Sequence, residues 1–358
     1  MNRRLITQSA RQFSLWGFVE GAPADPIMGI NDAFKKSTIP NKQLLGIGAY
    51  RDDNNKPYIL ECVKLAEEKI LRDNMDHEYS GIDGNPSFKD KCIKLAYGET
   101  SPILGNIASC QSLSGTGSLR VGMDFLREWY PNKNAKIYVS NPTWPTHKGI
   151  AARAGFEAVE YRYYDKAAKG FDCAGMLEDL DKADNGSIIL LHMCAHNPTG
   201  CDPSKEQWGQ ILEVIKRKGH FAAFDNAYQG FATGDLNNDA YSLRLFAENY
   251  SNVCLFQSMA KNFGLYGERA GCVSFLTESD KEAAIISSRI KQIARPMYSN
   301  PPIHGARVVD IILSDPKLTA SWHNSLKKMS SRMTDMRTGL VSKLAAEGST
   351  HDWSHITS

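Results

Sequence analysis

The chain has 358 residues, of which 42% are hydrophobic and 23% are charged, and its formal net charge is +2. A chain of this length and apolar content can bury a large core, which excludes intrinsic disorder and favours one large domain with a smaller one. Its charge is spread without long basic runs and no apolar stretch reaches the roughly 20 residues of a membrane span, which excludes the footprint of nucleic-acid binding and a membrane-spanning helix.

The first residues have the composition of a mitochondrial transit segment. They contain Arg3, Arg4 and Arg11, and no acidic residue precedes Glu20. Such segments are rich in arginine and poor in acids, although an ordinary amino terminus is the alternative. We therefore expect residues 1–14 to be a transit segment and the protein to lie in the mitochondrial matrix, with the cytoplasm as the alternative.

Helix-like and strand-like patterns alternate along the rest of the chain. In chain order, the apolar periodicity predicts helices at 61–72 and 118–129, strands at 137–140 and 188–192, a helix at 205–218, strands at 221–224 and 253–256, a helix at 281–292, and a helical stretch at 303–344 with a break near Pro316. Alternation of this kind predicts an α/β fold, with a mostly parallel sheet sandwiched by helices.

Lys261 follows the last of these strands and carries the most telling chemistry. A free amine can condense with the aldehyde of a cofactor and later move a proton, provided that its pKa is lowered. A lone lysine would more often be a surface residue. Ser258 and Arg269 flank it, however, and a hydroxyl and a guanidinium fork can together hold a phosphate. This combination points to pyridoxal 5'-phosphate.

Asp225 and Tyr228 follow the preceding strand. An aspartate there would keep a pyridine nitrogen protonated, which makes the ring an electron sink, and the phenol could donate a hydrogen bond to a ring oxygen. An aspartate at a strand end is more often a helix cap or turn former. The evidence for a cofactor site therefore comes from Asp225 and Tyr228 together.

Two further loops complete the predicted cofactor site. Ser114-Gly115-Thr116 precedes a helix expected to begin near Ser118, so that hydroxyls and backbone N–H groups would meet an anion at the positive end of the helix. This turn alone is weak evidence, since it is also an ordinary cap. Asn197 is stronger evidence for the cofactor site, because the proline that follows it restricts the turn.

A metal site in the same region is the less favoured reading. His192, Cys194 and His196 would alternate onto one face of a strand, with Cys201 nearby. Their spacing falls outside the usual zinc patterns, so we expect no metal. The eight cysteines of the chain include no Cys-x-x-Cys pair, which favours a reducing compartment.

Taken together, these residues resemble the aspartate aminotransferases, nearer the mitochondrial branch, among the fold-type I pyridoxal-phosphate enzymes. The resemblance spans nearly the whole chain and rests on eight motifs: Gly46–Arg51, Glu78–Tyr79, Leu113–Gly117, Asn141–Trp144, His196–Gly200, Phe224–Gly230, Ser258–Arg269 and Arg295–Pro302. It implies the fold-type I transferase fold, with a smaller α/β domain truncated at the carboxyl end. The implied divisions are an arm with part of the small domain at 15–57, the large cofactor-binding domain at 58–328, and the incomplete start of the remaining small domain at 329–358.

The resemblance also assigns roles to residues. Lys261 and Asp225 would be the cofactor lysine and the pyridinium partner, with Tyr228 as a further catalytic residue. The other cofactor contacts would come from Ser114, Gly115, Thr116, Trp144, Asn197, Ser258 and Arg269, and from Tyr79 of a neighbouring subunit. Substrate would contact Gly48, Trp144, Asn197 and the neighbour's Arg295, whose guanidinium would bind the side-chain carboxylate. A homodimer follows from this sharing, although Arg295 in isolation also reads as a helix-end cation.

The implied reaction transfers the amino group of L-aspartate to 2-oxoglutarate, giving oxaloacetate and L-glutamate in two half-reactions. The sequence departs from the family pattern in two places. The chain ends at Ser358, before the family's arginine for the α-carboxylate, and Pro145 follows Trp144 where the family has glycine, so that the local loop is expected to differ. Another fold-type I aminotransferase, of aromatic or kynurenine type, and a catalytically impaired cofactor-binding protein are the alternatives.

Overall fold

The computed structural model describes residues 15–22, 26–46 and 48–357. The expected transit segment, 1–14, lies outside the described residues.

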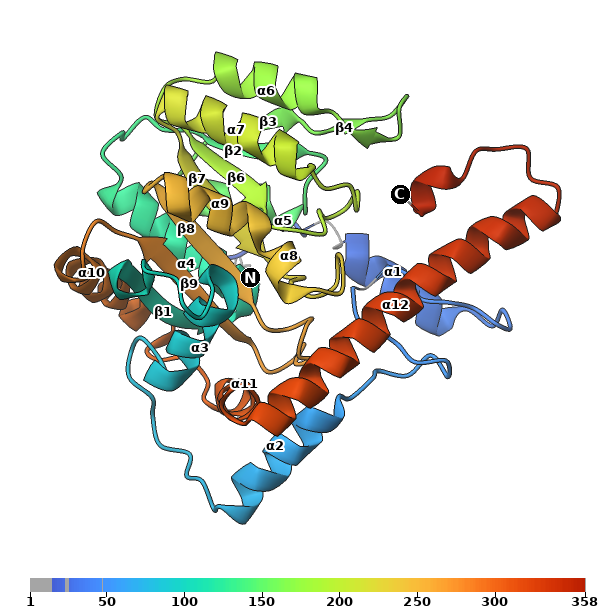
Figure 1. Cartoon of the computed structure of the whole chain (residues 1–358), viewed down its shortest axis with the longest axis horizontal. Coiled ribbons are helices and arrows are strands. Elements are labelled where there is room, and N and C mark those ends of the chain that lie inside the picture. Colours follow the sequence, from blue (N-terminus) through green and yellow to red (C-terminus); the bar gives the residue numbers. More distant parts are fainter. Residues whose placement is uncertain (1–14, 23–25, 47, 358) are drawn as a thin grey trace, which may run out of the picture.

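A seven-stranded sheet occupies the centre of the molecule (Figure 1), in the order β1-β9-β8-β7-β6-β2-β3. Neighbouring strands are parallel except at β9, which runs antiparallel to both β8 and β1. The expected mostly parallel α/β sheet is therefore confirmed. A separate ribbon pairs two short strands, β4 and β5. The strands are β1 (Ile107–Leu113), β2 (Ile137–Asn141), β3 (Ala158–Arg162), β4 (Tyr164–Asp165), β5 (Gly170–Phe171), β6 (Ile188–His192), β7 (Phe221–Asn226), β8 (Val253–Ser258) and β9 (Ala270–Leu276).

Helices cover both faces of this sheet because successive strand side chains point to opposite faces. In β6, Ile188 and Leu190 pack with helices α4, α5 and α10, whereas Ile189 and Leu191 pack with α6, α7 and α9. Burial on both faces explains why the strand is a continuous apolar run. The helices of these layers are α4 (Ser114–Trp129), α5 (Thr146–Arg153), α6 (Cys173–Lys182), α7 (Lys205–Lys218), α9 (Tyr241–Asn249) and α10 (Asp280–Tyr298).

A third apolar cluster lies at the loop that carries Lys261. It joins α2 and α3 to α11 and α12, and Phe263 and Trp322 are both fully buried in it. In Figure 1, α12 runs from this cluster away from the sheet as a long rod. The remaining helices are α1 (Pro26–Lys36), α2 (Glu61–Arg72), α3 (Pro86–Tyr97), α8 (Leu236–Asp239), α11 (His304–Ser314), α12 (Pro316–Ala346) and the short 3-10 turns η1 (Leu104–Asn106) and η2 (Ser354–Ile356).

The second half of α12 holds the segment before α2. Arg332 donates hydrogen bonds to the Asp53 carboxylate at 2.5 and 3.0 Å and to the Arg51 carbonyl at 3.2 Å. This contact keeps the chain around residue 50 beside the sheet edge where Lys261 lies. Among the described residues no strand follows β9, and the domain borders at 57/58 and 328/329 stay predictions.

The predicted element bounds hold for α2, α7 and β6 and differ elsewhere. The break near Pro316 separates α11 from α12, as expected. The helix expected near Ser118 instead begins at Ser114, so the Ser-Gly-Thr-Gly turn is its first turn. Pro145 lies just before α5 with a φ of −55°, which is the value that its ring favours, and the expected difference of this loop from the family stays a prediction.

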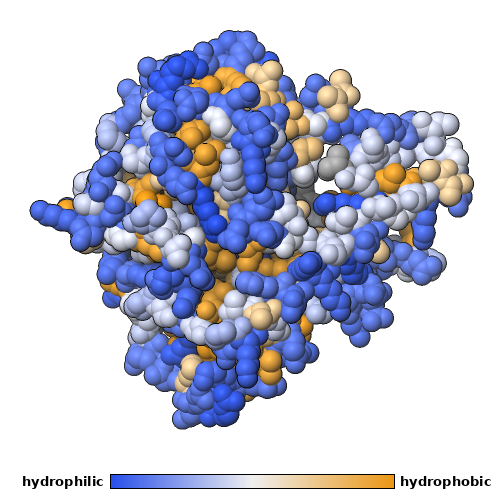
Figure 2. All heavy atoms as spheres, viewed as in Figure 1, coloured by the Kyte–Doolittle hydropathy of each residue, from blue (hydrophilic) through white to orange (hydrophobic). Residues whose placement is uncertain are grey.

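The face seen in Figure 2 is mostly hydrophilic, with hydrophobic residues in patches between polar ones. Large exposed apolar side chains occur near the amino end, at Leu15, Trp16 and Phe18, and on the outer part of α12, at Met336 and Leu340.

Candidate active site

The predicted cofactor residues gather at one edge of the sheet. Asp225 lies near the end of β7, Ser258 ends the adjacent parallel strand β8, and Lys261 is in the loop that follows. The carboxyl ends of parallel strands share an edge, and ligands of α/β proteins bind there. The strand patterns therefore predicted where this chemistry lies.

Lys261 is a half-buried amine with a specific partner. Its Nζ donates a hydrogen bond to the Gly48 carbonyl at 2.5 Å and lies 5.1 Å from the centre of the Tyr266 ring. Burial, together with the positive charge of Arg269, lowers the pKa of Lys261. A side chain at Gly48 would begin 3.2 Å from this amine and 3.6 Å from the Tyr228 hydroxyl, which places all three groups together.

A chain of hydrogen bonds ends at the Asp225 carboxylate. The Asn197 backbone N–H donates to His192 Nδ1 at 3.2 Å, so the ring proton of His192 is on Nε2 and points to the Thr143 hydroxyl, 3.5 Å away. The Thr143 hydroxyl also lies 2.8 Å from His147 Nδ1, and His147 Nε2 donates to the Asp225 carboxylate at 2.9 Å. Burial lowers the pKa of His192 to about 3, so this ring is neutral and can accept from the Asn197 N–H.

Small residues and hydroxyls form a cradle beside Lys261. The Ser114 and Ser258 hydroxyl oxygens lie 2.9 Å apart, and a side chain at Gly115 would begin 3.2 Å from Ser258 Cβ. Gly271 of β9 is more confined, since a side chain there would begin 2.6 Å from Ser114 Cα. Hydroxyls, the first turn of α4 and the nearby Arg269 suit a phosphate.

Two predicted cofactor residues are more open. Thr116, in the first turn of α4, is exposed. Trp144 is half-buried and meets His147 edge to face, with ring centres 5.2 Å apart. Trp144 therefore stands beside the Asp225 end of the site.

Tyr79 and Arg295 lie apart from these contacts in the single chain. Tyr79 is 81% exposed, and Arg295, in α10, is exposed and donates to its own neighbour Ser299 at 2.8 Å. The two segments do approach each other, since the Ser80 hydroxyl donates to the Pro301 carbonyl at 3.3 Å. Their predicted roles stay predictions.

The prediction that one strand would align the candidate metal ligands on one face is wrong. His192, Cys194 and His196 do not alternate along one strand, because β6 ends at His192. His196 instead stacks on Tyr163, with ring centres 3.8 Å apart, and burial lowers its pKa to about 2. In the part of the chain that the structure describes, no three His, Cys, Asp or Glu side chains are placed to hold a metal ion.

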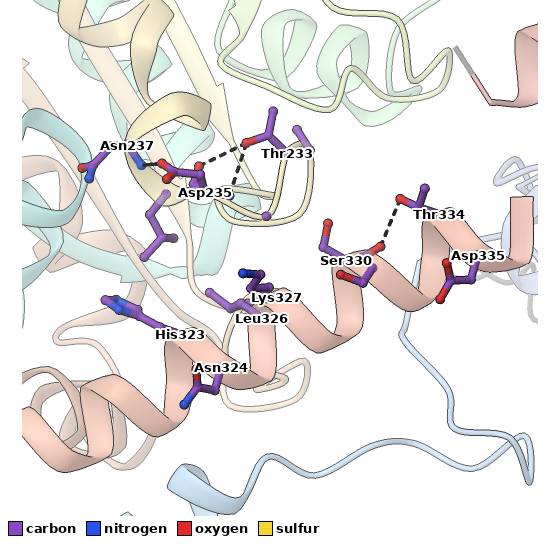
Figure 3. Close-up of a pocket in the computed structure, with 14 residues that line it drawn as sticks. Thr233, Asp235, Asn237, His323, Asn324, Leu326, Lys327, Ser330, Thr334 and Asp335 are labelled. Carbon is purple, nitrogen blue, oxygen red and sulfur yellow. Dashed lines mark hydrogen bonds between the residues drawn. The ribbon is translucent and has the colours of Figure 1, made fainter. Parts of the chain in front are cut away.

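A cavity of about 690 Å³ lies elsewhere (Figure 3). Thr233, Asp235 and Asn237 border it on one side, and His323 and Lys327 of α12 on the other. No predicted site residue lines it. The cavity is related to the site only through α12, which lines the cavity and also packs on the loop that carries Lys261.

Sequence reasoning missed His147, Thr143 and His192 as parts of the site. His147 is fully buried against Asp225, which lies 78 residues away in the chain. The available signal was its position three residues after Trp144, which places both side chains near the start of the same helix.

Comparison with known proteins identifies the family. The family model of the class I and II aminotransferases matches residues 40–358. The chain belongs to this family. The mitochondrial aspartate aminotransferase of Dictyostelium discoideum is 49% identical over 362 residues, which span 99% of this chain and 84% of that protein.

Solved aminotransferases share the fold. A mitochondrial aspartate aminotransferase from Trypanosoma brucei is 47% identical with a TM-score of 0.87, and the match covers 92% of this chain and 85% of that one. An aromatic-amino-acid aminotransferase from Burkholderia pseudomallei, covalently bound to pyridoxal phosphate, is 41% identical with a TM-score of 0.93, covering 96% and 86%.

Class I and II aminotransferases use pyridoxal phosphate, and the residues at the sheet edge fit it. An amine with a lowered pKa, a carboxylate fixed by a buried histidine, and a small-residue cradle with two hydroxyls match its aldehyde, ring nitrogen and phosphate. No helix in the described ranges is long and apolar enough to cross a membrane.

Proposed function

We propose that this aminotransferase transfers the amino group of L-aspartate to 2-oxoglutarate, giving oxaloacetate and L-glutamate. The observation that carries the proposal is the half-buried Lys261 amine, held at the Gly48 carbonyl beside Tyr228 and Arg269. Curated relatives at 47 to 49% identity are aspartate aminotransferases, which supports the same choice of substrate.

Each side chain has a role in this proposal. The cofactor, when bound, supplies an electron-withdrawing ring that stabilises negative charge at the substrate Cα. Lys261, neutral for part of the time because of its lowered pKa, accepts the Cα proton. Asp225, oriented by His147, keeps a positive charge at the ring nitrogen. The phosphate would be held by Ser114, Gly115, Thr116, Ser258 and Arg269, and the ring oxygen by Asn197 and Tyr228.

The test follows the absorption of the purified chain with pyridoxal phosphate, before and after aspartate, beside a Lys261→Ala control. We expect a cofactor band that depends on Lys261 and that aspartate converts to the amine form of the cofactor. A band that ignores aspartate would refute transamination by this chain, and a band equal in the Lys261→Ala variant would refute the cofactor assignment.

The substrate assignment has a specific competitor, because an aromatic-amino-acid aminotransferase shares the fold at 41% identity. We infer a preference for dicarboxylates from the expected contact of Arg295 with a second carboxylate. Steady-state kinetics with aspartate and phenylalanine decide between the two. A higher kcat/KM for phenylalanine would replace the proposal by aromatic transamination.

We also propose that the chain works as a homodimer with shared sites. Exposed Tyr79 and Arg295, on neighbouring segments, are available to a second copy. Mixing a Lys261→Ala chain with an Arg295→Leu chain should then restore about a quarter of the wild-type activity, because half of randomly formed dimers contain one intact site of two. No recovery, with mixed dimers present by mass spectrometry, would contradict shared sites.

We propose the mitochondrial matrix as the location, in line with the names of the relatives. Import into isolated mitochondria, with and without residues 1–14, tests it. Import that does not depend on this segment would contradict the transit assignment.

A further inference from the structure

One side chain of α12 holds the two residues that follow Lys261. The indole N–H of Trp322 donates to the Asn262 carbonyl at 2.8 Å, and its ring stacks on Phe263, with centres 4.3 Å apart and planes 9° from parallel. Trp322 and Phe263 are fully buried, and Asn262 is 2% exposed. The backbone after Lys261 is thus fixed by a polar and an apolar contact from one residue.

Gln229 ties the same dipeptide to the strand that carries Asp225. Its backbone carbonyl accepts a hydrogen bond from Asn262 Nδ2 at 3.4 Å. Its fully buried side chain donates to the Leu95 and Leu236 carbonyls at 2.9 and 3.1 Å and accepts from Asn226 Nδ2 at 3.1 Å. An amide with partners on both its nitrogen and its oxygen has one orientation available.

We propose that Trp322 and Gln229 are positioning residues for Lys261, which together clamp Asn262-Phe263 and so hold the Lys261 amine in register with the Asp225 carboxylate. Among the described residues, the hydrogen bonds of the Gln229 side chain and of the Trp322 indole go to residues outside the predicted cofactor site. The clamp acts through the neighbours of the two reactive residues, since Asn262 follows Lys261 and Asn226 follows Asp225. The catalytic half of this inference rests on the proposed function.

The physical reason is the length of the lysine side chain. Its four-carbon stem is flexible, and the amine keeps its hydrogen bond to the Gly48 carbonyl and its place over the Tyr266 ring only if the backbone below it is fixed. Positioning matters because a misplacement of about 1 Å can cost on the order of 100-fold in rate. A loosened loop would also let water reach the amine, which would move the pKa of Lys261 back up toward its ordinary value.

Trp322→Phe tests the clamp, because it removes the indole N–H and keeps an aromatic ring against Phe263. Trp208→Phe is the matched control: this tryptophan is 5% exposed and its ring centre lies 6.1 Å from those of Phe224 and Phe246, away from Lys261. In cofactor-free protein, acylation of Lys261 by acetic anhydride across pH, read by peptide mass spectrometry, reports the state of the amine. We expect the midpoint to move to higher pH in Trp322→Phe and to stay unchanged in Trp208→Phe.

In the cofactor-loaded enzyme, Trp322→Phe should lower kcat by about 10- to 100-fold with KM within about twofold, as expected when geometry rather than binding is lost. Asn262→Ala, which removes the contact with Gln229 and keeps the carbonyl that Trp322 needs, should shift the acylation midpoint in the same direction and serves if Trp322→Phe does not fold.

Identical acylation midpoints in Trp322→Phe, Asn262→Ala and Trp208→Phe would overturn the clamp. This result is independent of the proposed function, because acylation needs neither cofactor nor substrate. Wild-type protein without transaminase activity would refute the proposed function, while a shifted midpoint would still support the clamp.

Discussion

The reactive residues at the sheet edge come from distant parts of the chain, since the Lys261 amine binds the Gly48 carbonyl and the Asp225 carboxylate binds His147. Lys261, Asp225 and Ser258 stand after apolar runs, where strand ends present polar groups, so their chemistry was predictable. His147 was missed, because its partner Asp225 is 78 residues away and its one local signal, the position three residues after Trp144, does not name that partner. Pairings of this kind depend on tertiary contacts and are absent from local pattern.

Arg269 gives a prediction at this scale, because its charge lowers the pKa of Lys261. In Arg269→Gln the positive neighbour is lost, the protonated amine becomes less unfavourable, and the pKa of Lys261 rises. Lys261 acylation should therefore need higher pH than in wild type. Arg295→Gln is the control, as its charge is not among the causes of the shift. An unchanged midpoint in Arg269→Gln would show that burial alone sets the pKa.

Whole elements were predictable where one periodicity runs without interruption. The bounds of α2, α7 and β6 follow directly from their apolar patterns. The start of α4 was not predicted correctly. Serine, threonine and glycine are poor helix formers, and their pattern indicates a turn. Strands β1 and β9 were not predicted at all. Both contain buried serines or glycine among their apolar residues, which conceals the strand pattern.

Strand β9 carries a prediction about Gly271. A methyl group there would begin 2.6 Å from the Gln257 carbonyl and 2.6 Å from Ser114 Cα. Gly271→Ala should therefore lower the free energy of unfolding by about 1–3 kcal/mol, the usual cost of overpacking. It should also weaken binding of the cofactor, since Ser114 must move.

Gly209 supplies the comparison for that measurement. It lies inside α7, and an added methyl group would meet no other atom within 4 Å, so Gly209→Ala should raise the free energy of unfolding by up to about 1 kcal/mol. Urea denaturation and a cofactor titration of both variants give the result. Equal stability changes would mean that β9 has room that the structure does not show.

The molecule as a whole should lose stability in acid because of its buried histidines. In the folded protein the pKa values of His192 and His196 are about 3 and about 2, whereas an unfolded histidine titrates near 6.5. Below about pH 6.5 the unfolded state therefore binds protons that the folded state does not, and folding is disfavoured. Each histidine contributes a loss of about 1.4 kcal/mol per pH unit, from about pH 6 down to its folded pKa.

Urea denaturation of cofactor-free protein at fixed concentration, between pH 6 and pH 4, measures this slope. His196→Gln removes one titrating group and should reduce the slope by about 1.4 kcal/mol per pH unit. Lys205→Gln, a change on the exposed start of α7, should leave it unaltered. A slope that is the same in His196→Gln would mean that His196 is protonated in the folded protein at these pH values.

The reversed direction of β9 has a consequence for how the site assembles during folding. Because β8 and β9 are antiparallel neighbours, the loop between them is closed locally, with the Met259 N–H bonded to the Ala270 carbonyl at 3.0 Å. Lys261 and Arg269 are thus brought near each other by a pairing of short sequence range, which costs little chain entropy to form. The two cradle serines, by contrast, are 144 residues apart. The pair that tunes the amine can therefore form as an early local unit, and the anion cradle closes over it only after the distant first strand has docked.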